Sequence, residues 1–498
     1  MLLELHSHTC KYSKCSFADP VELVKKTVFK HLQGLVITEH GLLWKDQELI
    51  QLRIDAELSD NFLLFSGQEV STDIGHVLVF GAKDSISESI KLKDLRQKYP
   101  DACLIWAHPF RGGNIPKDEI INSPLLDAIE ILSSNHSPKE NYLGISFWHK
   151  YKFTAVSGTD THDLSIAGKL PTQFDHPVYT MEDIVREIRA GRCRPFLKEI
   201  PKAGSNLIVT ELTLGTKGED EIRDRIIVKQ FIKDNKWEKA RSTAVMIKEL
   251  QVQGFDVGNC RIPKLIDIND QERLIIEEGQ RGKSLFDLLI LVNKDLGADY
   301  IKMAAVWLAK FHKINIKIAG TGESLRQEKK RIINYRKAFI DTNSPYRKKI
   351  EPVIDFVWEQ EEEILLRDQE CFIQAHGDFH PKNIIIGQDR LHDLNTRFVS
   401  VIDFDSSLVM PLAFDVGYFL SQLRTQLGLK QKDYIFNDNL FLETYLDNIG
   451  NIDKKIFLEE VELFKLRAYL SIATFLIKVG KGQSPEMEEL ISLILQGF

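Results

Sequence analysis

Short apolar runs and longer amphipathic stretches alternate along the N-terminal part of the chain. The apolar runs cover residues 2–5, 35–38, 63–65, 76–80, 102–106, 128–132 and 153–156. Short apolar runs bounded by turn residues predict buried strands, and the periodic stretches between several of them predict helices. This alternation is typical of an α/β fold with a mainly parallel sheet.

The first helix of the chain is predicted from its cap and its apolar face. Asp19 is a preferred N-cap residue, and Pro20 suits the first helical position. Val21, Val24 and Val28 follow at helical spacing. We therefore predict a helix that starts at Pro20 and buries these valines.

The pattern changes after an amphipathic helix predicted over residues 180–192. Residues 195–205 hold two prolines and a glycine, so we place a domain boundary there. Beyond it, residues 207–214 and 224–232 predict a hairpin with its turn at Gly215–Gly218, which is either a lid over nucleotide phosphates or an ordinary hairpin. Further helices are predicted over residues 237–250, 300–312 and 434–498, and further strands over residues 371–375, 384–387 and 398–402.

Composition and charge limit the kind of protein. With 43% hydrophobic and 28% charged residues, the chain has the composition of a globular protein. No apolar run approaches the roughly 18 residues of a membrane span, so no membrane partner is expected. The net charge of −7 argues against generic nucleic-acid binding. The six scattered cysteines and the absence of a signal-peptide pattern at the N-terminus predict a cytoplasmic location.

Histidine and carboxylate side chains recur where the predicted N-terminal strands end. In barrel-like α/β folds the carboxyl ends of the strands meet at one mouth. Imidazole and carboxylate groups gathered there suit borderline divalent metals such as zinc, manganese or iron. We therefore predict a polynuclear metal site formed by His6, His8, His40, Glu69, His108, His136, Asp160 and His162.

The motifs that carry this prediction are His6-Ser-His8, Glu39-His40, Glu69, Ala107-His108-Pro109 and Asp160-Thr-His162. Together they resemble the PHP (polymerase and histidinol phosphatase) family of metal-dependent phosphoesterases. The resemblance implies a distorted (β/α)7 barrel over residues 1–198. It implies one metal on His6, His8, Glu69 and Asp160, a second on Glu69, His108 and His136, and a third to which His40 and His162 contribute.

Two features near these motifs leave alternatives open. Many family members carry a further His or Asp five or six residues after the second histidine, where this chain has Ser13 and Lys14. The third metal therefore depends on Cys15 or a water molecule as the substitute. Arg111 is either a clamp for a substrate phosphate or a solvated surface residue.

A second group of polar residues lies around the loop between the strands predicted at residues 371–375 and 384–387. Asp378 is followed five residues later by Asn383, and Asp403 comes at the end of a later predicted strand. Phosphoryl transfer from a nucleotide needs a carboxylate near the acceptor hydroxyl, with amide and carboxylate oxygens for magnesium. The loop and its neighbouring strand supply this set.

The sequences HGDFHPKN and VIDFD, which contain these residues, resemble the catalytic loop and metal motif of the aminoglycoside phosphotransferase and choline kinase-like family. That family is similar to protein kinases in fold. The resemblance covers residues 205–498 and implies a two-lobed α+β domain, with an N-lobe over 205–280 and a C-lobe over 281–498. By the same resemblance Asp378 is the catalytic base and Asn383 and Asp403 hold magnesium.

The resemblance also assigns supporting roles. Asp415 is expected to support the catalytic loop. Lys229, an isolated lysine among apolar strand residues, is expected to bind the nucleotide phosphates. Its predicted partner on the following helix is Glu238, with Glu249 as the alternative.

These observations predict a bifunctional enzyme. The N-terminal domain is expected to hydrolyse a small-molecule phosphate ester with two or three zinc, manganese or iron ions. The C-terminal domain is expected to transfer the γ-phosphate of Mg-ATP or Mg-GTP to a small-molecule hydroxyl. Two alternatives stay open: the N-terminal domain is a non-catalytic metal-binding or regulatory module, or the C-terminal domain binds nucleotide only to gate the phosphoesterase.

Overall fold

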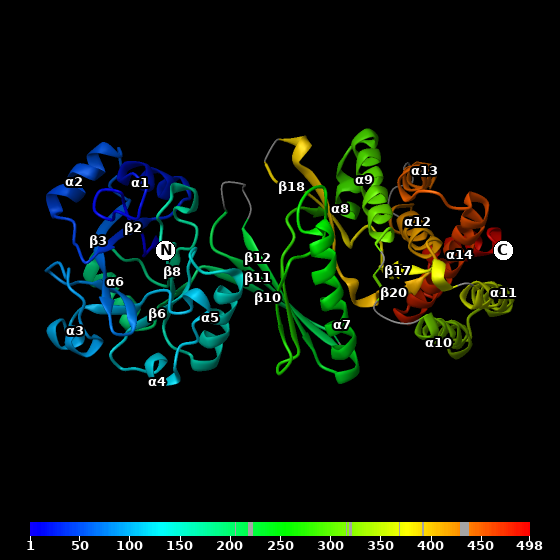
Figure 1. Cartoon of the computed structure of the whole chain (residues 1–498), viewed down its shortest axis with the longest axis horizontal. Coiled ribbons are helices and arrows are strands. Elements are labelled where there is room, and N and C mark those ends of the chain that lie inside the picture. The colour runs from blue at the N-terminus through cyan, green and yellow to red at the C-terminus, as the bar shows by residue number, and fades with distance from the viewer. Residues whose placement is uncertain are drawn as a thin grey trace. The chain divides into compact units, whose positions relative to one another are not determined.

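The computed structural model describes residues 1–204, 206–217, 223–314, 316–317, 321–367, 369–390, 393–428 and 438–498. Its helices and strands form two compact units (Figure 1). The first contains Met1–Gln230 and Asn269–Gly279, and the second contains Phe231–Ile268 and Gln280–Phe498. The domain boundary placed within residues 195–205 stays a prediction, and β10 (Leu197–Ala203) lies there.

The first unit is built on a nine-stranded sheet with the order β7-β6-β5-β4-β3-β2-β1-β8-β9. Its strands are β1 (Leu2–Glu4), β2 (Gly34–His40), β3 (Leu63–Thr72), β4 (Gly75–Phe80), β5 (Cys103–Trp106), β6 (Ala128–Leu132), β7 (Ala155–Ser157), β8 (Thr172–Phe174) and β9 (Cys193–Pro195). Its helices are α1 (Pro20–Phe29), α2 (Asp46–Asp55), α3 (Leu92–Lys98), α4 (Asp118–Ile121), α5 (Pro138–Tyr151) and α6 (Met181–Arg189). Each apolar run that predicted a strand here overlaps one of β1 to β7, so those predictions are confirmed.

The sheet mixes parallel and antiparallel pairs. Strands β1, β2 and β3 pair in parallel, as do β5, β6 and β7. However, β4 runs antiparallel to both β3 and β5, and β8 runs antiparallel to β1 and β9. The prediction of a mainly parallel sheet is therefore wrong in part. The connection between β3 and β4, residues 73–74, is a hairpin turn, far too short for the crossover that parallel neighbours need.

Strands β1 and β7 approach each other although they are far apart in the sheet order. An isolated parallel bridge joins Ser7, just after β1, to Thr161, just after β7. The sheet is thereby nearly closed on itself. Its central strands are covered on both faces, since Leu35, Val36 and Ile37 of β2 are all fully buried.

Helix α1 begins as predicted but buries a different face. The side chain of Asp19 caps it by accepting hydrogen bonds from the backbone of residues 21 and 22. The residues that it buries are Leu23, Val24 and Thr27, whereas Val28 is 40% exposed. The prediction that Val28 lies in the core is therefore wrong.

A second sheet of the first unit contains β10, β11 (Leu207–Leu214), β12 (Asp224–Phe231) and β15 (Leu274–Glu278), side by side in this order. The strands of the predicted hairpin are confirmed as β11 and β12. Gly218, the last residue of its predicted turn, lies outside the described residues.

The second unit is mostly helical. Its helices are α7 (Asp234–Leu250), α8 (Leu285–Leu291), α9 (Lys294–His312), α10 (Thr321–Asp341), α11 (Arg347–Leu366), α12 (Ala413–Gly428), α13 (Asp438–Ile449), α14 (Lys454–Lys478) and α15 (Pro485–Gln496). Its short strands are β13 (Cys260–Arg261), β14 (Leu265–Asn269), β16 (Lys283–Ser284), β17 (Ile373–Ala375), β18 (Ile384–Gln388), β19 (Arg397–Val401) and β20 (Leu408–Met410). Among the described residues no helix combines the length and the apolar character needed to cross a membrane.

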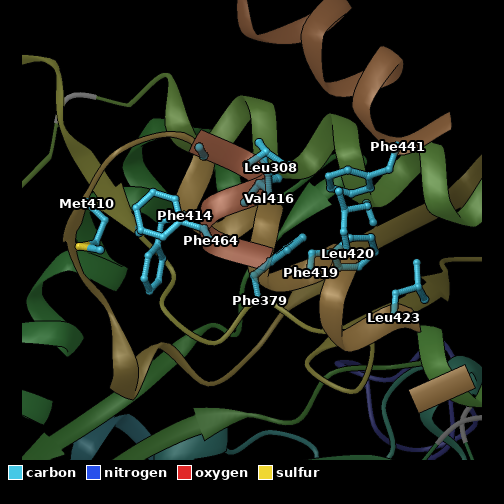
Figure 2. Close-up of a cluster of buried hydrophobic side chains, with 14 of the residues drawn as sticks. Leu308, Phe379, Met410, Phe414, Val416, Phe419, Leu420, Leu423, Phe441 and Phe464 are labelled. Atoms are coloured by element: carbon cyan, nitrogen blue, oxygen red, sulfur yellow. The ribbon is translucent and has the colours of Figure 1, made fainter. Parts of the chain in front are cut away.

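The core of the second unit reaches the loop between β17 and β18. Phe379 of this loop is fully buried and packs on Phe419 of α12, with ring centroids 5.4 Å apart (Figure 2). Phe419 in turn stacks on Phe441 of α13 at 4.3 Å. Trp307 of α9 also stacks on Phe379, with ring centroids 5.8 Å apart. A loop anchored by a buried aromatic side chain holds its neighbouring polar residues in fixed positions.

Candidate active sites

The predicted metal ligands of the first unit lie on or just after strands of the nine-stranded sheet. Among the described residues, ligand atoms within 4.8 Å of one another form three groups: His6, His8 and Asp160; His6, Glu69 and His108; and His8, His40 and His162. The structure thus brings together every predicted ligand except His136, which belongs to none of these groups.

The group with the most regular spacing is His6, His8 and Asp160. The Nε2 atoms of His6 and His8 are 3.2 Å apart. Asp160 Oδ1 lies 3.3 Å from His6 Nε2 and 3.2 Å from His8 Nε2. Ligand atoms about 2.0–2.1 Å from a tetrahedrally coordinated zinc ion lie about 3.3–3.4 Å from one another. The three atoms therefore fit the corners of one coordination sphere.

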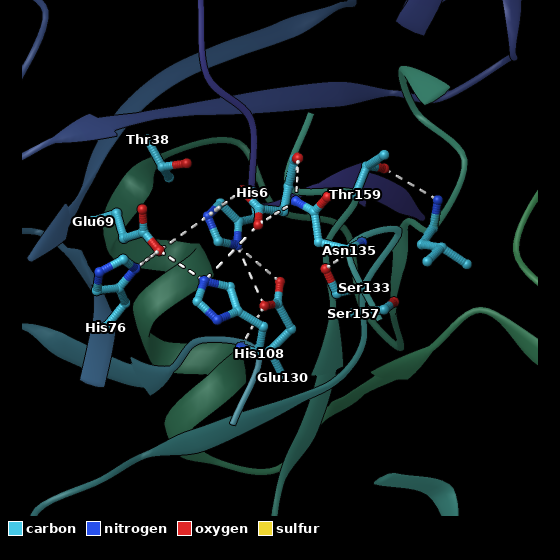
Figure 3. A network of polar contacts seen from close by, with 12 residues as sticks. His6, Thr38, Glu69, His76, His108, Glu130, Ser133, Asn135, Ser157 and Thr159 are labelled. Atoms are coloured by element: carbon cyan, nitrogen blue, oxygen red, sulfur yellow. Dashed lines mark hydrogen bonds and ion pairs between the residues drawn. The ribbon is translucent and has the colours of Figure 1, made fainter. Parts of the chain in front are cut away.

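Glu69 connects the groups (Figure 3). Its Oε1 lies 3.0 Å from His108 Nε2 and 2.9 Å from His76 Nδ1. Its Oε2 lies 2.8 Å from His40 Nδ1. Burial alone would raise the pKa of Glu69, but hydrogen bonds from these three histidines hold that pKa well below its ordinary value. An ionised carboxylate with both oxygens facing the cluster suits a bridge between two cations.

His136 Nε2 is among the buried polar atoms of this region that make no hydrogen bond within the described residues, and the nearest groups to Asp160 Oδ1 are the imidazole nitrogens of His6 and His8. His136 Nδ1 lies 3.2 Å from Asn141 Oδ1, a contact that fixes the ring and leaves Nε2 as the ligand atom. A buried polar group without a partner costs about 1–3 kcal/mol, so such atoms are rare. A metal ion would satisfy both kinds of atom, and the residues present therefore fit divalent metal binding.

Glu130, which the sequence analysis missed, lies beside the cluster (Figure 3). Its Oε1 is 3.0 Å from His6 Nδ1, and its Oε2 accepts a hydrogen bond from the backbone N–H of His108 at 2.8 Å. Burial would lower the pKa of His6, but the carboxylates of Asp160 and Glu130 raise it to about 10. This negative potential favours a bound cation. The signal in the sequence was a charged residue inside the apolar run 128–132.

His76 was also missed, because it begins a strand instead of ending one. β4 runs antiparallel to β3, so its first residues lie at the edge of the sheet where the parallel strands end. His76 Nδ1 thereby reaches Glu69. Arg111, the candidate phosphate clamp, is exposed.

The second candidate site is the loop between β17 and β18. β17 leads into His376, and β18 begins directly after Asn383. β19 pairs antiparallel with β18 and leads to Asp403. The backbone N–H of Ile402 donates to the Asn383 carbonyl at 2.9 Å, which places Asn383 next to the end of β19. The predicted strands on both sides of this loop are therefore confirmed.

Asp415, on the first turn of α12, supports this loop as predicted. It is fully buried, and its Oδ2 and Oδ1 accept hydrogen bonds from the backbone N–H groups of His376 at 2.6 Å and Gly377 at 2.9 Å. His312 Nε2 lies 3.1 Å from the same Oδ2, and His312 Nδ1 lies 2.8 Å from the Tyr445 hydroxyl. These contacts fix the backbone that carries Asp378 and give His312 a structural role.

Both carboxylate oxygens of Asp378 are engaged. The Tyr418 hydroxyl donates to Oδ1 at 2.7 Å. Asn383 Nδ2 donates to Oδ2 at 3.2 Å, and His380 Nε2 lies 3.5 Å from the same oxygen. Burial would raise the pKa of Asp378, but the contacts with His380 and Tyr418 lower it. Asp378 is therefore an ionised, weakly basic carboxylate, suited to orienting a hydroxyl group.

Asn383 and Asp403 fit a magnesium ion by donor type. Asn383 Nδ2 donates to the backbone carbonyl of Asp378 at 3.1 Å and to its Oδ2, so the amide oxygen is directed away from Asp378. Asp403 has a φ of 67° and is exposed. Non-glycine residues with this backbone conformation cluster at functional sites. Amide and carboxylate oxygens are the ligands that magnesium prefers.

Lys229 lies on β12 of the first unit. It is 9% exposed, and its Nζ is 3.3 Å from Glu277 Oε2 on the neighbouring β15. Glu238 is exposed on α7 of the second unit, and its pairing with Lys229 stays a prediction.

A cavity of about 540 Å³ in the second unit is lined by Asp378 at one side. Helices α12, α14 and α15 supply most of its wall. Its apolar side chains are Ile472, Phe475, Leu476, Leu490 and Leu493, and its polar ones include Tyr418, Gln422, Arg424, Gln426, Glu486 and Glu489. A cavity of this size suits a small-molecule ligand with both apolar and hydrogen-bonding groups.

Several solved structures resemble the chain at low identity. An ADP-bound aminoglycoside phosphotransferase shares 16% identity over 60% of this chain and 92% of its own, with a TM-score of 0.38. An ethanolamine kinase of Plasmodium vivax shares 14% over 60% and 81%, with a TM-score of 0.40. A macrolide 2'-phosphotransferase of Brachybacterium faecium shares 14% over 60% and 91%, with a TM-score of 0.34. These scores are too low to support a conclusion.

Sequence comparison with protein families gives two matches, whereas no curated protein matches the chain significantly. Residues 138–193 match the PHP-associated family, which is limited support for a PHP-type first unit because the segment is short. Residues 224–447 match the phosphotransferase enzyme family and include Asp378, Asn383 and Asp403. The C-terminal part of the chain is therefore similar in sequence to the phosphotransferase enzyme family.

Proposed function

We propose that the chain is a bifunctional enzyme whose C-terminal part transfers a phosphoryl group from a nucleoside triphosphate to a hydroxyl of a small molecule. The arrangement of Asp378 and Asn383 on an anchored loop, with Asp403 just after the neighbouring β19, carries this proposal. The match of this segment to the phosphotransferase enzyme family supports the same reading. The acceptor would occupy the cavity beside Asp378.

Asp378 would orient the acceptor hydroxyl by accepting its hydrogen bond. In a loose transition state the hydroxyl loses its proton late, so a carboxylate of low basicity is sufficient. Tyr418 and Asn383 hold the carboxylate in one orientation from opposite oxygens. This arrangement explains why a carboxylate with a lowered pKa suits the reaction.

Asn383 and Asp403 are the residues that would hold magnesium. When bound, magnesium neutralises the negative charge that the triphosphate oxygens carry in the transition state. Lys229 is proposed to bind the phosphates of ATP or GTP, with Glu238 in support. Its ammonium group already lies beside a carboxylate, that of Glu277, which fixes its position.

The test is phosphoryl transfer from Mg-ATP or Mg-GTP to a panel of amino sugars, amino alcohols, sugars and nucleosides, with products identified by mass spectrometry. Asp378→Asn should lower the rate at least about 100-fold, because it keeps the shape and removes the charge that orients the hydroxyl. The matched control is Asp447→Asn, at an exposed position of α13. Unchanged transfer by Asp378→Asn would refute the proposal.

A second function is favoured by the tetrahedral spacing of the ligand atoms of His6, His8 and Asp160 and by the buried His136 Nε2, which makes no hydrogen bond within the described residues. We infer that the first unit, as a distorted (β/α)7 barrel of the PHP type, hydrolyses a small-molecule phosphate ester with two or three zinc, manganese or iron ions. The residues that would hold them are His6, His8, Glu69 and Asp160 for one ion, Glu69, His108 and His136 for another, and His40 and His162 for a third.

These ions, when bound, would activate water and stabilise charge on the phosphate oxygens. The protein's own side chains orient the metal ligands. Glu130 fixes His6 through its Nδ1, so that Nε2 faces the cluster. His76 holds Glu69 Oε1, and the same oxygen lies beside His108. Removal of the Glu130 or the His76 side chain is expected to weaken metal binding before it lowers the stability of the fold.

The first measurement for this function is the metal content of the purified protein beside the double variant His6→Ala/His108→Ala. Two or three equivalents in the wild type, lost in the variant, together with hydrolysis of phosphate esters, are expected. Metal binding without hydrolysis of any ester would instead select the alternative of a silent metal-binding or regulatory module. No bound metal after incubation with manganese or zinc would refute the metal centre. The cytoplasmic location inferred from the sequence stays a prediction.

A further inference from the structure

We propose that Cys15, His40 and His162 form a separate metal position at the rim of the N-terminal cluster, with a thiolate ligand and a preference for a thiophilic divalent ion such as zinc. The proposal rests on the metal centre proposed for the first unit and assigns the ligand that the third ion otherwise lacks. All three residues are more accessible than His6, His8 and Asp160, which are almost completely buried.

The two histidines are already oriented for metal binding. His40 Nδ1 lies 2.8 Å from Glu69 Oε2, and His162 Nδ1 lies 3.0 Å from the backbone carbonyl of Asp160. In metal sites, a ligating imidazole usually donates its other N–H to a carboxylate or carbonyl. Each ring therefore directs its Nε2 as the ligand atom.

His8 lies close enough to bind the same ion, but its Nε2 already belongs to the inner ligand group. Its ring stacks on that of His40, with centroids 4.4 Å apart, and is tilted against that of His162, with centroids 4.6 Å apart. One imidazole nitrogen binds one ion, and His8 Nε2 is already 3.2 Å from Asp160 Oδ1 and from His6 Nε2. His40 and His162 therefore need a third ligand from elsewhere.

Ser13 is not that ligand. Its hydroxyl donates to Glu39 Oε2 at 2.5 Å and lies 3.3 Å from His8 Nδ1. Glu39 also accepts a hydrogen bond from Thr9 Oγ1 at 2.5 Å. The Ser13 hydroxyl is thus bound to a buried carboxylate on the side of His8 away from the cluster.

Cys15 meets the geometric requirement toward His40. Its Sγ lies 3.3 Å from His40 Nε2. For a tetrahedral zinc ion with Zn–S of about 2.3 Å and Zn–N of about 2.0–2.1 Å, the two ligand atoms should be about 3.6 Å apart. A shift of a few tenths of an ångström would therefore be enough to admit the ion between them.

The backbone around Cys15 is held next to both histidine loops. The Ser16 hydroxyl donates to the carbonyl of His8 at 3.0 Å. The backbone N–H of Phe17 donates to the carbonyl of His162 at 2.8 Å. These bonds fix the segment that carries Cys15 beside the loops of His8 and His162, so the thiol does not need to be recruited from a distant loop.

The donor atoms separate this position from the inner ones. The inner groups combine imidazole with the carboxylates of Asp160 and Glu69, which also suit manganese or iron. A set of one thiolate and two imidazoles selects zinc more strongly. With three protein ligands, a tetrahedral ion keeps one open position, which is the arrangement of catalytic rather than structural zinc sites. A substrate phosphate oxygen would fill that position.

The test loads the full-length protein with Co²⁺ and records its absorption spectrum. Thiolate ligation gives an intense sulfur-to-cobalt charge-transfer band in the near ultraviolet, which imidazole and carboxylate ligands do not. The band is expected in the wild type and in the control Cys10→Ser, whose cysteine is also exposed. Cys15→Ser should lose the band and one equivalent of zinc. Cys15→His should lose the band but retain the zinc.

The outcomes separate this proposal from the function on which it rests. Cobalt binding by the wild type without the band, or a band that survives in Cys15→Ser, would overturn the role of Cys15 and leave the inner metal centre standing. Failure of the wild type to bind any metal would overturn both. Retention of the band in Cys10→Ser with its loss in Cys15→Ser supports the assignment.

Discussion

Asp415→Asn tests how the second unit holds its candidate catalytic loop. Asp415 is fully buried, and its two oxygens accept hydrogen bonds from the backbone N–H groups of His376 at 2.6 Å and Gly377 at 2.9 Å. Asparagine has the same shape, but one of its two terminal atoms is an NH₂ group that cannot accept a hydrogen bond. Whichever way the amide turns, one buried backbone N–H loses its acceptor.

The magnitude follows from this geometry. A buried donor left unsatisfied costs about 1–3 kcal/mol, and hydrogen bonds to a charged group lie at the upper end of this range. We therefore expect Asp415→Asn to lower the free energy of unfolding of the second unit by about 3 kcal/mol. Because the loop also carries Asp378, phosphoryl transfer should fall as well.

The assay is urea unfolding followed by circular dichroism, whose helical signal comes mainly from the second unit because the helices of the first unit are fewer and shorter. The matched control is Asp447→Asn, the same substitution at an exposed position of α13, which should change stability by less than about 0.5 kcal/mol. The metal content of the first unit should be the same in both variants. If Asp415→Asn proves as stable as Asp447→Asn, the carboxylate does not hold the loop and the reasoning is wrong.

Three further predictions concern the second unit. Tyr418→Phe removes a hydrogen bond that lowers the pKa of Asp378, so the acidic limb of the pH–rate profile for transfer should move to higher pH, and an unmoved limb would contradict this role. Burial and the charge of Glu328 raise the pKa of Glu361 well above its ordinary value, so the folded protein binds the proton of this carboxyl group more tightly than the unfolded chain does. The free energy of unfolding therefore falls as pH rises above the ordinary pKa of glutamate. Glu361→Gln should flatten this part of the stability profile, measured by urea unfolding. Glu328→Gln should cost about 3–5 kcal/mol, because the buried Arg467 loses a carboxylate that lies 2.6 Å away, and a cost no larger than that of Glu361→Gln would refute the ion pair.

The sequence alone located most of the elements and the residues that meet at the two candidate sites. Short apolar runs and caps are local signals, so the strands on both sides of Asp378 and the start of α1 at Pro20 were predicted correctly. The same is true of the strand ends that carry His6 and Asp160, which the structure brings within 3.3 Å of each other. Such residues can be found in a sequence because backbone geometry fixes where a strand delivers its next side chain.

Other residues depended on contacts between distant parts of the chain. His76 reaches Glu69 only because β4 is antiparallel, and that direction was set by a two-residue turn that the strand pattern did not reveal. Glu130 lies inside an apolar run, and its contact with His6 spans 124 residues. α1 buries Thr27 and exposes Val28, because the neighbouring elements and not the helix decide which face is covered. Periodicity along the chain thus determined which segments form helices and strands and which strand ends carry the candidate site residues. Tertiary packing decided the strand direction, the buried face of each helix and the partners of buried charges, because each of these depends on contacts between segments far apart in sequence.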